Sequence, residues 1–179
     1  MVEINNLDFG FASPLFEGFS YSFGDSGIVA VTGGSGKGKS TLLNIIAGLI
    51  KTDAVKKDGG VAFLFQDNRL LPWLTAKQNV ELLSNGADAD DLLSKVGLSN
   101  FKDYYPRDLS GGMQRRVCFA ATLAANAPII LLDEPTANLD LENAEIIRRL
   151  TKEASKKALV IIASHSEEDI AIADRVISL

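Results

Sequence analysis

The sequence GGSGKGKST, at residues 33–41, decides the fold of this chain. It fits the pattern G-x-x-x-x-G-K-[ST], in which glycines allow backbone N–H groups to converge on phosphate oxygens without a Cβ clash. The partial positive charge at the start of the following helix favours the same phosphates. We therefore expect the whole loop to bind a nucleotide. Its residues are Gly33, Gly34, Ser35, Gly36, Lys37, Gly38, Lys39, Ser40 and Thr41.

The segments on either side of this loop supply the context that the motif requires. Apolar residues 28–31 predict a strand before the loop, and residues 42–49 predict an amphipathic helix after it. In this setting Lys39 is expected to reach the β- and γ-phosphates, and the Ser40 hydroxyl is expected to hold Mg²⁺. The alternative is a glycine-rich turn that contains Lys-Ser by chance.

The size, composition and charge of the chain exclude some classes of protein. Its 179 residues suffice for one domain with a sizeable core, and 46% hydrophobic residues are ordinary for a globular protein. The net charge of −5 argues against a general nucleic-acid binder, so no nucleic-acid partner is expected. The sequence shows no signal-peptide pattern, and no apolar run approaches the roughly 20 residues that span a bilayer. We expect a soluble, cytoplasmic protein that meets a membrane only through a partner.

Cys118 is the only cysteine, so no intrachain disulfide can form. It lies in an apolar helical run at residues 117–120, which favours a buried, inert thiol over a catalytic one.

Predicted strands and helices alternate along most of the chain. Further strands are predicted at residues 2–9, 16–23, 61–65, 129–132 and 158–163. The last two are apolar without alternation, which is typical of buried parallel strands, and residues 142–157 between them have helical spacing. This order predicts an α/β fold with a mostly parallel sheet.

The middle of the chain looks different from the rest. Residues 75–105 look helical, with breaks at Gly86 and Gly97, and Ser110 is a plausible N-cap for a helix that runs to about Ala125. We therefore expect one domain, 1–179, in which residues 67–110 form a small, mostly helical lobe beside the sheet.

Two carboxylates, Asp133 and Glu134, follow the apolar strand 129–132. A carboxylate at the end of a buried strand, beside a phosphate loop, is well placed to bind Mg²⁺. The next carboxylate can orient or deprotonate an attacking water. The alternative is an acidic turn ended by Pro135.

A second glycine-containing helix start lies at residues 109–114, with Ser110, Gly111 and Gly112 in its first turn. Free N–H groups at such a start can bind an anion. One nucleotide does not need two such sites in one chain, but two chains arranged head to tail can use one each. The alternative is an ordinary N-cap softened by glycine.

With these motifs in this order, the chain resembles the ATP-binding subunits of ABC transporters over nearly its whole length. Residues 33–41 match the Walker A loop, 109–113 the signature motif, 129–134 the Walker B strand, and 138–140 the D-loop. The resemblance implies a P-loop NTPase fold with a reduced antiparallel part, a head-to-tail dimer, and ATP with Mg²⁺ as ligands.

The resemblance also assigns roles to three residues outside these motifs. Gln66 matches the Q-loop and is implied as a further Mg²⁺ ligand with Ser40 and Asp133. His165, the only histidine, matches the switch histidine beside the catalytic Glu134, although a lone histidine is usually structural. Phe11 occupies the place of the aromatic that stacks on adenine, with core packing as the alternative.

A narrower resemblance concerns residues 66–75, which look like the importer branch for nitrate, sulfonate and taurine. It implies membrane permease subunits as partners and a position on the inner face of the cell membrane. Trp73 would then lie near the permease, the alternative being an aromatic in the core of the lobe.

The chain also departs from the family pattern. Residues 51–60 are polar where a β-hairpin is usual, the sequence stops at Leu179 soon after the strand around residues 176–177, and Met113 replaces a common glutamine. Lys37 stands where a small residue is favoured; it either attracts phosphate or faces solvent. Two other functions stay open at this point: a soluble ABC ATPase that acts as an assembly scaffold, and a nucleotide-binding regulatory module without turnover.

Overall fold

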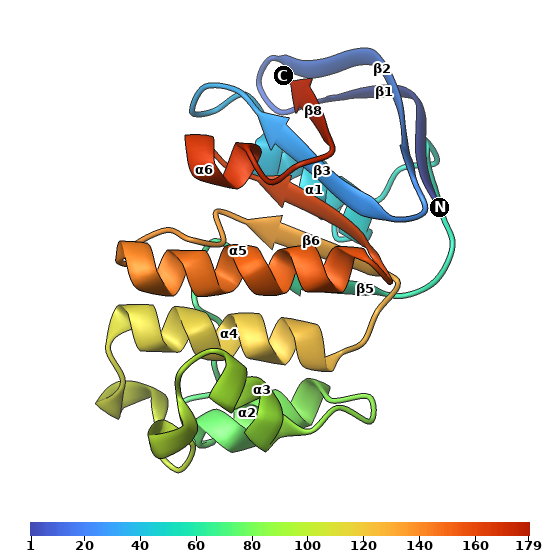
Figure 1. The fold of residues 1–179 in the computed structure, drawn as a ribbon. Helices are drawn as coiled ribbons and strands as arrows, with labels where there is room; N and C mark the ends of the chain where they lie inside the picture. Colours follow the sequence, from blue (N-terminus) through green and yellow to red (C-terminus); the bar gives the residue numbers. More distant parts are fainter.

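A five-stranded sheet runs through the middle of the molecule in the order β5-β6-β7-β3-β8, and every neighbouring pair is parallel (Figure 1). The computed structural model describes residues 1–179. The strands of this sheet are β3 (Gly27–Thr32), β5 (Val61–Leu64), β6 (Ile129–Asp133), β7 (Leu159–Ala163) and β8 (Arg175–Ser178). The predicted α/β architecture with a mostly parallel sheet is confirmed.

The two faces of this sheet pack into two separate cores because alternate residues of each strand point to opposite sides. On one side, Val29 and Leu131 pack with helix α1 (Lys39–Ala47) and the antiparallel strands. On the other side, Ile130 and Val160 pack with the helices α4 (Gly111–Ala124) and α5 (Leu141–Ser155). The strands are therefore covered on both faces, which explains their unbroken apolar sequence.

The first face is covered by a smaller antiparallel sheet in the order β2-β1-β4. It consists of β1 (Val2–Gly10), β2 (Pro14–Gly24) and β4 (Val55–Lys57). The sequence did not predict β4, a three-residue strand in a polar segment. Its Lys57 Nζ donates hydrogen bonds to the carbonyls of Ile46 and Ala47 and so caps the end of α1.

The phosphate-loop segment folds as strand, loop and helix, as predicted, between β3 and α1. Gly38 immediately precedes α1 with φ +95°, and a Cβ there would come within 2.9 Å of Leu15 Cδ2. Only glycine fits this position, because both the backbone conformation and the space exclude a side chain.

The helical lobe predicted at residues 67–110 is present and lies at the bottom of Figure 1, beside α4. It contains α2 (Ala76–Leu83), α3 (Ala89–Lys95) and the short 3-10 turns Ser99–Phe101 and Pro106–Asp108. Thr75 and Gln78 form a capping box at the start of α2. The predicted breaks at Gly86 and Gly97 are confirmed, with φ of +78° and +71°.

The end of the chain adds a short helix that the sequence did not predict, α6 (Glu167–Ile170), between β7 and β8. None of the helices has the length and apolar character that crossing a membrane requires.

Candidate active site

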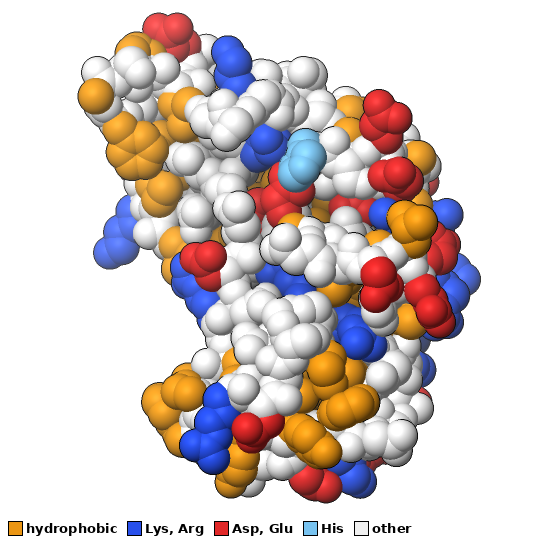
Figure 2. All heavy atoms as spheres, turned by 90° about the vertical axis from the view of Figure 1, so that its left-hand side faces the viewer, with side chains coloured by type: hydrophobic (Ala, Val, Ile, Leu, Met, Phe, Trp, Pro, Cys, Tyr) orange, Lys and Arg blue, Asp and Glu red, His pale blue; other side chains and the backbone are white.

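A cavity of about 650 Å³ opens at the carboxyl ends of four neighbouring strands, β3, β5, β6 and β7. This edge of a parallel sheet is where α/β proteins bind ligands. In Figure 2 the histidine lies at the surface with acidic atoms directly beneath it and basic atoms beside it. The lining residues are Gly33, Gly34, Ser35, Gly36, Gly38, Lys39, Ser40, Thr41, Gln66, Asp133, Glu134, Ala137 and His165.

The structure therefore brings most of the predicted site together from four separate parts of the sequence. Phe11, Lys37 and the Ser110–Gly112 turn do not line this cavity. The Lys37 side chain is exposed and borders a different hollow beside Phe16 and Leu179. The exposed side chain agrees with the solvent-facing interpretation of Lys37, and a contact of Lys37 with phosphate stays a prediction.

The phosphate loop presents its positive charge at the mouth of the cavity. Lys39 Nζ donates hydrogen bonds to the carbonyls of Gly33, at 2.8 Å, and Gly34, at 3.3 Å. The ammonium group is thus held across the loop, beside the free N–H groups at the start of α1. An ammonium in this position can pair with phosphate oxygens.

The residues predicted to hold Mg²⁺ fit that ion. Ser40, Gln66 and Asp133 all line the cavity and offer hydroxyl, amide and carboxylate oxygens, the ligands that Mg²⁺ prefers. Burial raises the pKa of Asp133, and a hydrogen bond from the Ser40 hydroxyl opposes this by stabilising the charged carboxylate. A bound cation would favour the charged form further.

The side chains of Glu134 and His165 contact each other in the cavity. Glu134 Oε1 lies 2.8 Å from His165 Nδ1, and Glu134 Oε2 lies 3.3 Å from Ser164 Oγ. Glu134 has φ +48°, a left-handed conformation that is uncommon for a residue with a Cβ atom. The carboxylate is thus oriented by two side chains while its residue is held in a disfavoured backbone conformation, an arrangement that is enriched at active sites.

A buried hydrogen-bond network around Asp169, next to Glu134, was not predicted from the sequence. Asp169 is 1% exposed and accepts hydrogen bonds from Arg148 Nε at 2.9 Å, Thr136 Oγ1 at 2.7 Å and Ser164 Oγ at 3.0 Å. Since Ser164 also touches Glu134, the network fixes a neighbour of the candidate catalytic carboxylate. In the sequence, Asp169 is one of three acidic residues at 167–169. Nothing in that run distinguished the buried residue from the exposed ones.

The second glycine-containing helix start does not line the cavity of its own chain. Ser110 Oγ accepts a hydrogen bond from Met113 N at 3.2 Å and so caps α4, as predicted. Ser110 and Gly111 are exposed. The turn is an N-cap, and its outward position leaves it accessible to a second molecule.

The structure also decides three alternatives about single residues. The Phe11 side chain is 77% exposed at the turn between β1 and β2, so core packing is excluded. Trp73 is 68% exposed, which excludes a place in the core of the lobe. Cys118 is buried, and burial raises the pKa of its thiol to about 11, as expected for an inert cysteine.

Comparison with known proteins identifies the class of this fold and site. The sequence model described as "ABC transporter" matches residues 16–137. The chain belongs to the ABC transporter family and is an ATP-binding subunit of the ABC ATPase type.

Particular relatives agree with this assignment. The aliphatic sulfonates import ATP-binding protein SsuB 2 of Pseudomonas syringae pv. tomato is 38% identical over 160 residues, which cover 84% of this chain and 69% of that protein. The uncharacterized ABC transporter ATP-binding protein Rv0073 of Mycobacterium tuberculosis is 35% identical over 199 residues, covering 95% of this chain. This chain spans only 60% of the length of that relative.

A solved structure gives the fold comparison. The ATP-binding cassette MJ0796, in a dimeric post-hydrolysis state bound to ADP and Pi, superposes with a TM-score of 0.89 and 31% sequence identity. The match covers 100% of this chain and 94% of that chain.

Proposed function

We propose that this chain hydrolyses ATP at sites shared between two copies arranged head to tail, and that this hydrolysis powers a membrane importer. The observation that carries the proposal is the Glu134 carboxylate, which lies in one cavity with the phosphate loop and 2.8 Å from His165. Glu134 offers a base where an attacking water would meet the last phosphate.

The residues that bind ATP all belong to one chain. The N–H groups of loop 33–41 and the Lys39 ammonium hold the phosphates, and Ser40, Gln66 and Asp133 hold Mg²⁺. The bound ion neutralises charge on the phosphates. Phe11, exposed on the β1–β2 turn, stacks on the adenine ring.

Closure of two copies completes each site. Ser110 and Gly112 of each copy contact the γ-phosphate held by the other, because the start of α4 lies outside the cavity of its own chain. Glu134 then accepts the proton of the attacking water, and His165 contacts the γ-phosphate. The dimeric, ADP- and Pi-bound state of MJ0796 supports this arrangement.

The transport partner is a pair of membrane permease subunits, which would hold the chain on the inner face of the cell membrane. The name of the sulfonate import relative supports the import direction. The exposed Trp73 on the helical lobe offers an apolar contact to such a partner. Two experiments test the proposal: release of phosphate from ATP by the purified chain, and its copurification with a polytopic membrane protein. A scaffold would lack the second property, and a regulatory module the first.

The substitution Lys39→Ala is expected to weaken ATP binding by about 10–100-fold, because a charge-assisted contact to the phosphates is lost. Isothermal titration calorimetry with Mg–ATP measures this change. The variant Lys51→Ala, which removes an exposed lysine outside the cavity, is the control and should bind ATP normally. Unchanged affinity in Lys39→Ala would contradict the assignment of the phosphate loop.

The substitution Phe11→Ala is expected to cost about 1–3 kcal/mol of ATP affinity, the magnitude of base–aromatic stacking in other proteins. Because Phe11 is 77% exposed, the thermal unfolding temperature of the chain should hardly change. Titration with ATP and with inorganic triphosphate separates the causes. Loss of stacking weakens binding of ATP only, whereas equal loss for both ligands would contradict a contact to the base.

A further inference from the structure

Arg115, on the inner side of α4, is a buried cation without a carboxylate partner. Its residue is 3% exposed, and no salt bridge involves it within 4.0 Å. Its guanidinium group donates to five backbone carbonyls instead, which matches the five N–H donors that an arginine carries. Burial lowers the pKa of Arg115, and the nearby carboxylates of Asp133 and Glu134 act in the opposite direction.

The five acceptors belong to two loops of the candidate active site. Nη1 donates to the carbonyls of Phe65 and Gln66, directly after β5. Nη2 and Nε donate to three consecutive carbonyls at the end of β6, those of Asp133, Glu134 and Pro135. A single planar group therefore joins the segment of the Mg²⁺ ligand Gln66 to the segment of the candidate base.

The hydrogen bond from Arg115 to the Glu134 carbonyl helps to hold an uncommon backbone conformation. Glu134 adopts φ +48°, and three hydrogen bonds hold its peptide groups. Its N–H donates to Ala163 O at 2.8 Å, and its carbonyl accepts from Arg115 Nη2 at 2.7 Å and from Ala137 N at 3.2 Å. A disfavoured conformation persists only where the surroundings enforce it. Removal of the guanidinium would take away the shorter of the two hydrogen bonds that the Glu134 carbonyl accepts.

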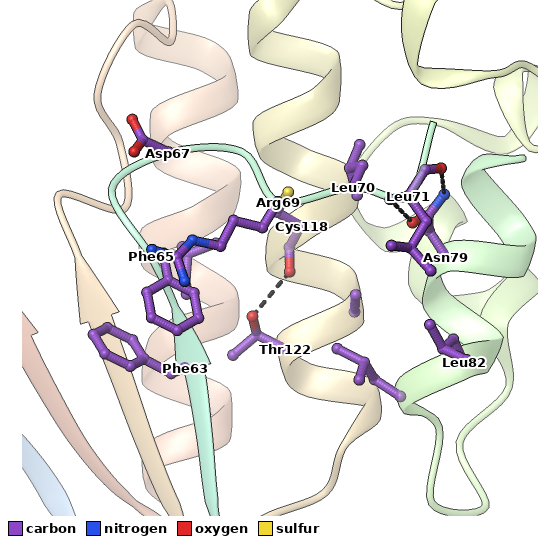
Figure 3. A pocket seen from close by; sticks show the side chains of 13 residues that line it. Phe63, Phe65, Asp67, Arg69, Leu70, Leu71, Asn79, Leu82, Cys118 and Thr122 are labelled. Carbon is purple, nitrogen blue, oxygen red and sulfur yellow. Dashed lines mark hydrogen bonds between the residues drawn. The ribbon is translucent and has the colours of Figure 1, made fainter. Parts of the chain in front are cut away.

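One of the carbonyls that Arg115 bonds belongs to Phe65, whose residue also lines a pocket on the lobe side of the sheet. Figure 3 shows Phe65 and Arg69 together at one end of this pocket, which has a volume of about 190 Å³ and lies between β5, α2 and α4. The Arg69 guanidinium carbon lies 3.6 Å from the centre of the Phe65 ring. Phe65 thus lines the pocket with its ring and accepts from Arg115 with its carbonyl.

We infer that Arg115 is a positioning residue, which holds the loops after β5 and β6 in one fixed relation so that the Glu134 carboxylate points at the attacking water. This inference rests on the proposed function, because it assigns Glu134 the role of base. Arg115 touches no nucleotide itself, since it does not line the cavity. Arg115 acts by donating hydrogen bonds to backbone carbonyls. No other side chain at this position offers five donors in the same planar geometry.

The test is Arg115→Lys in the full chain, with Arg115→Gln as a second variant. A lysine keeps the charge but has only three donors and no planar fork, so it cannot bond both loops fully. We expect kcat for ATP to fall by about 10–100-fold, as for other small misplacements of a reacting group. The ATP dissociation constant should stay within about threefold of the wild-type value, because Arg115 does not line the cavity and a misplaced base slows the chemical step without weakening binding.

Arg116→Lys is the matched control. Arg116 is the next residue on the same helix and half-buried, but its guanidinium donates to Val96 O in the lobe and not to either loop. Turnover of this variant should equal that of the wild type. A loss of kcat of the same size in both variants would overturn the inference, because it would reflect general damage to α4.

A double variant gives a readout that a purely structural role would not change. If Arg115 acts through Glu134, then Arg115→Lys should lower the single-turnover rate less in the Glu134→Gln background than in the wild type. Equal factors in both backgrounds would overturn the inference, and so would unchanged turnover in Arg115→Lys. If neither Arg115 variant folds, Arg115 serves the fold rather than the site, which also overturns it. A wild-type chain without ATPase activity would instead contradict the proposed function.

Discussion

Glu134→Gln is expected to slow ATP hydrolysis by roughly 10²–10⁴-fold, the contribution typical of a positioned general base. The amide cannot accept the proton of the attacking water, although it can keep a hydrogen bond to His165 at the observed 2.8 Å. ATP binding should persist, because Lys39 and the loop amides are unchanged. The rate of phosphate release measures turnover, and light scattering should show that the variant accumulates as an ATP-bound dimer.

A carboxylate far from the cavity provides the control for this substitution. Glu153 lies on α5, is about half exposed and pairs only with Arg149. Glu153→Gln therefore removes the same charge and should keep full turnover, because exposed ion pairs contribute little. Near-normal turnover in Glu134→Gln would remove Glu134 from the catalytic role.

Ser110→Arg is expected to lower the rate of ATP hydrolysis by more than about 100-fold and to leave the ATP affinity of the monomer unchanged. Ser110 is exposed and lies outside the cavity of its own chain, so an arginine there does not touch that nucleotide. It would instead hinder closure of the second copy. Calorimetry on dilute protein measures the affinity, and phosphate release measures the turnover.

Two controls separate this effect from damage to α4. Ser110→Asp keeps an N-cap, so its unfolding temperature shows how much of any loss in Ser110→Arg comes from the missing cap. Ser94→Arg places the same cation on an exposed face of α3 and should turn over normally. Weaker ATP binding by dilute Ser110→Arg would mean that this helix start serves its own nucleotide, contrary to the head-to-tail arrangement.

Mixing two inactive variants extends the test. In a mixed dimer of Ser110→Arg and Lys39→Ala, one shared site carries both lesions and the other carries neither. Part of the activity should therefore return on mixing if one intact site can turn over and a half-occupied dimer can close.

The parts of the fold that could be predicted from sequence are those fixed by local patterns. Loop 33–41 requires its glycines locally, and strands β6 and β7 are recognisable because every residue in them is buried and all except Asp133 are apolar. The short strand β4 was missed because its pairing with β1 depends on residues far away in the sequence, not on its own Val-Lys-Lys composition.

The candidate site likewise contains residues that the sequence could identify and residues that it could not. Asp133 could be placed at the sheet edge because it ends an apolar run, and His165 was assigned to the same site by the family resemblance. Asp169 and Arg115 could not be found, because their partners lie in other segments and their significance comes from burial. Arg115 and Arg116 are adjacent identical letters in the sequence, and only the structure shows that one bonds the catalytic loops and the other the lobe.

The central claim is that hydrolysis occurs at sites shared by two copies, and the most direct test is the turnover per chain as a function of chain concentration at saturating Mg–ATP. Light scattering on the same samples gives the fraction of dimer. The account predicts that turnover per chain rises with concentration in proportion to this fraction and vanishes for the monomer. A monomer that hydrolyses ATP as fast per chain as the dimer would contradict it.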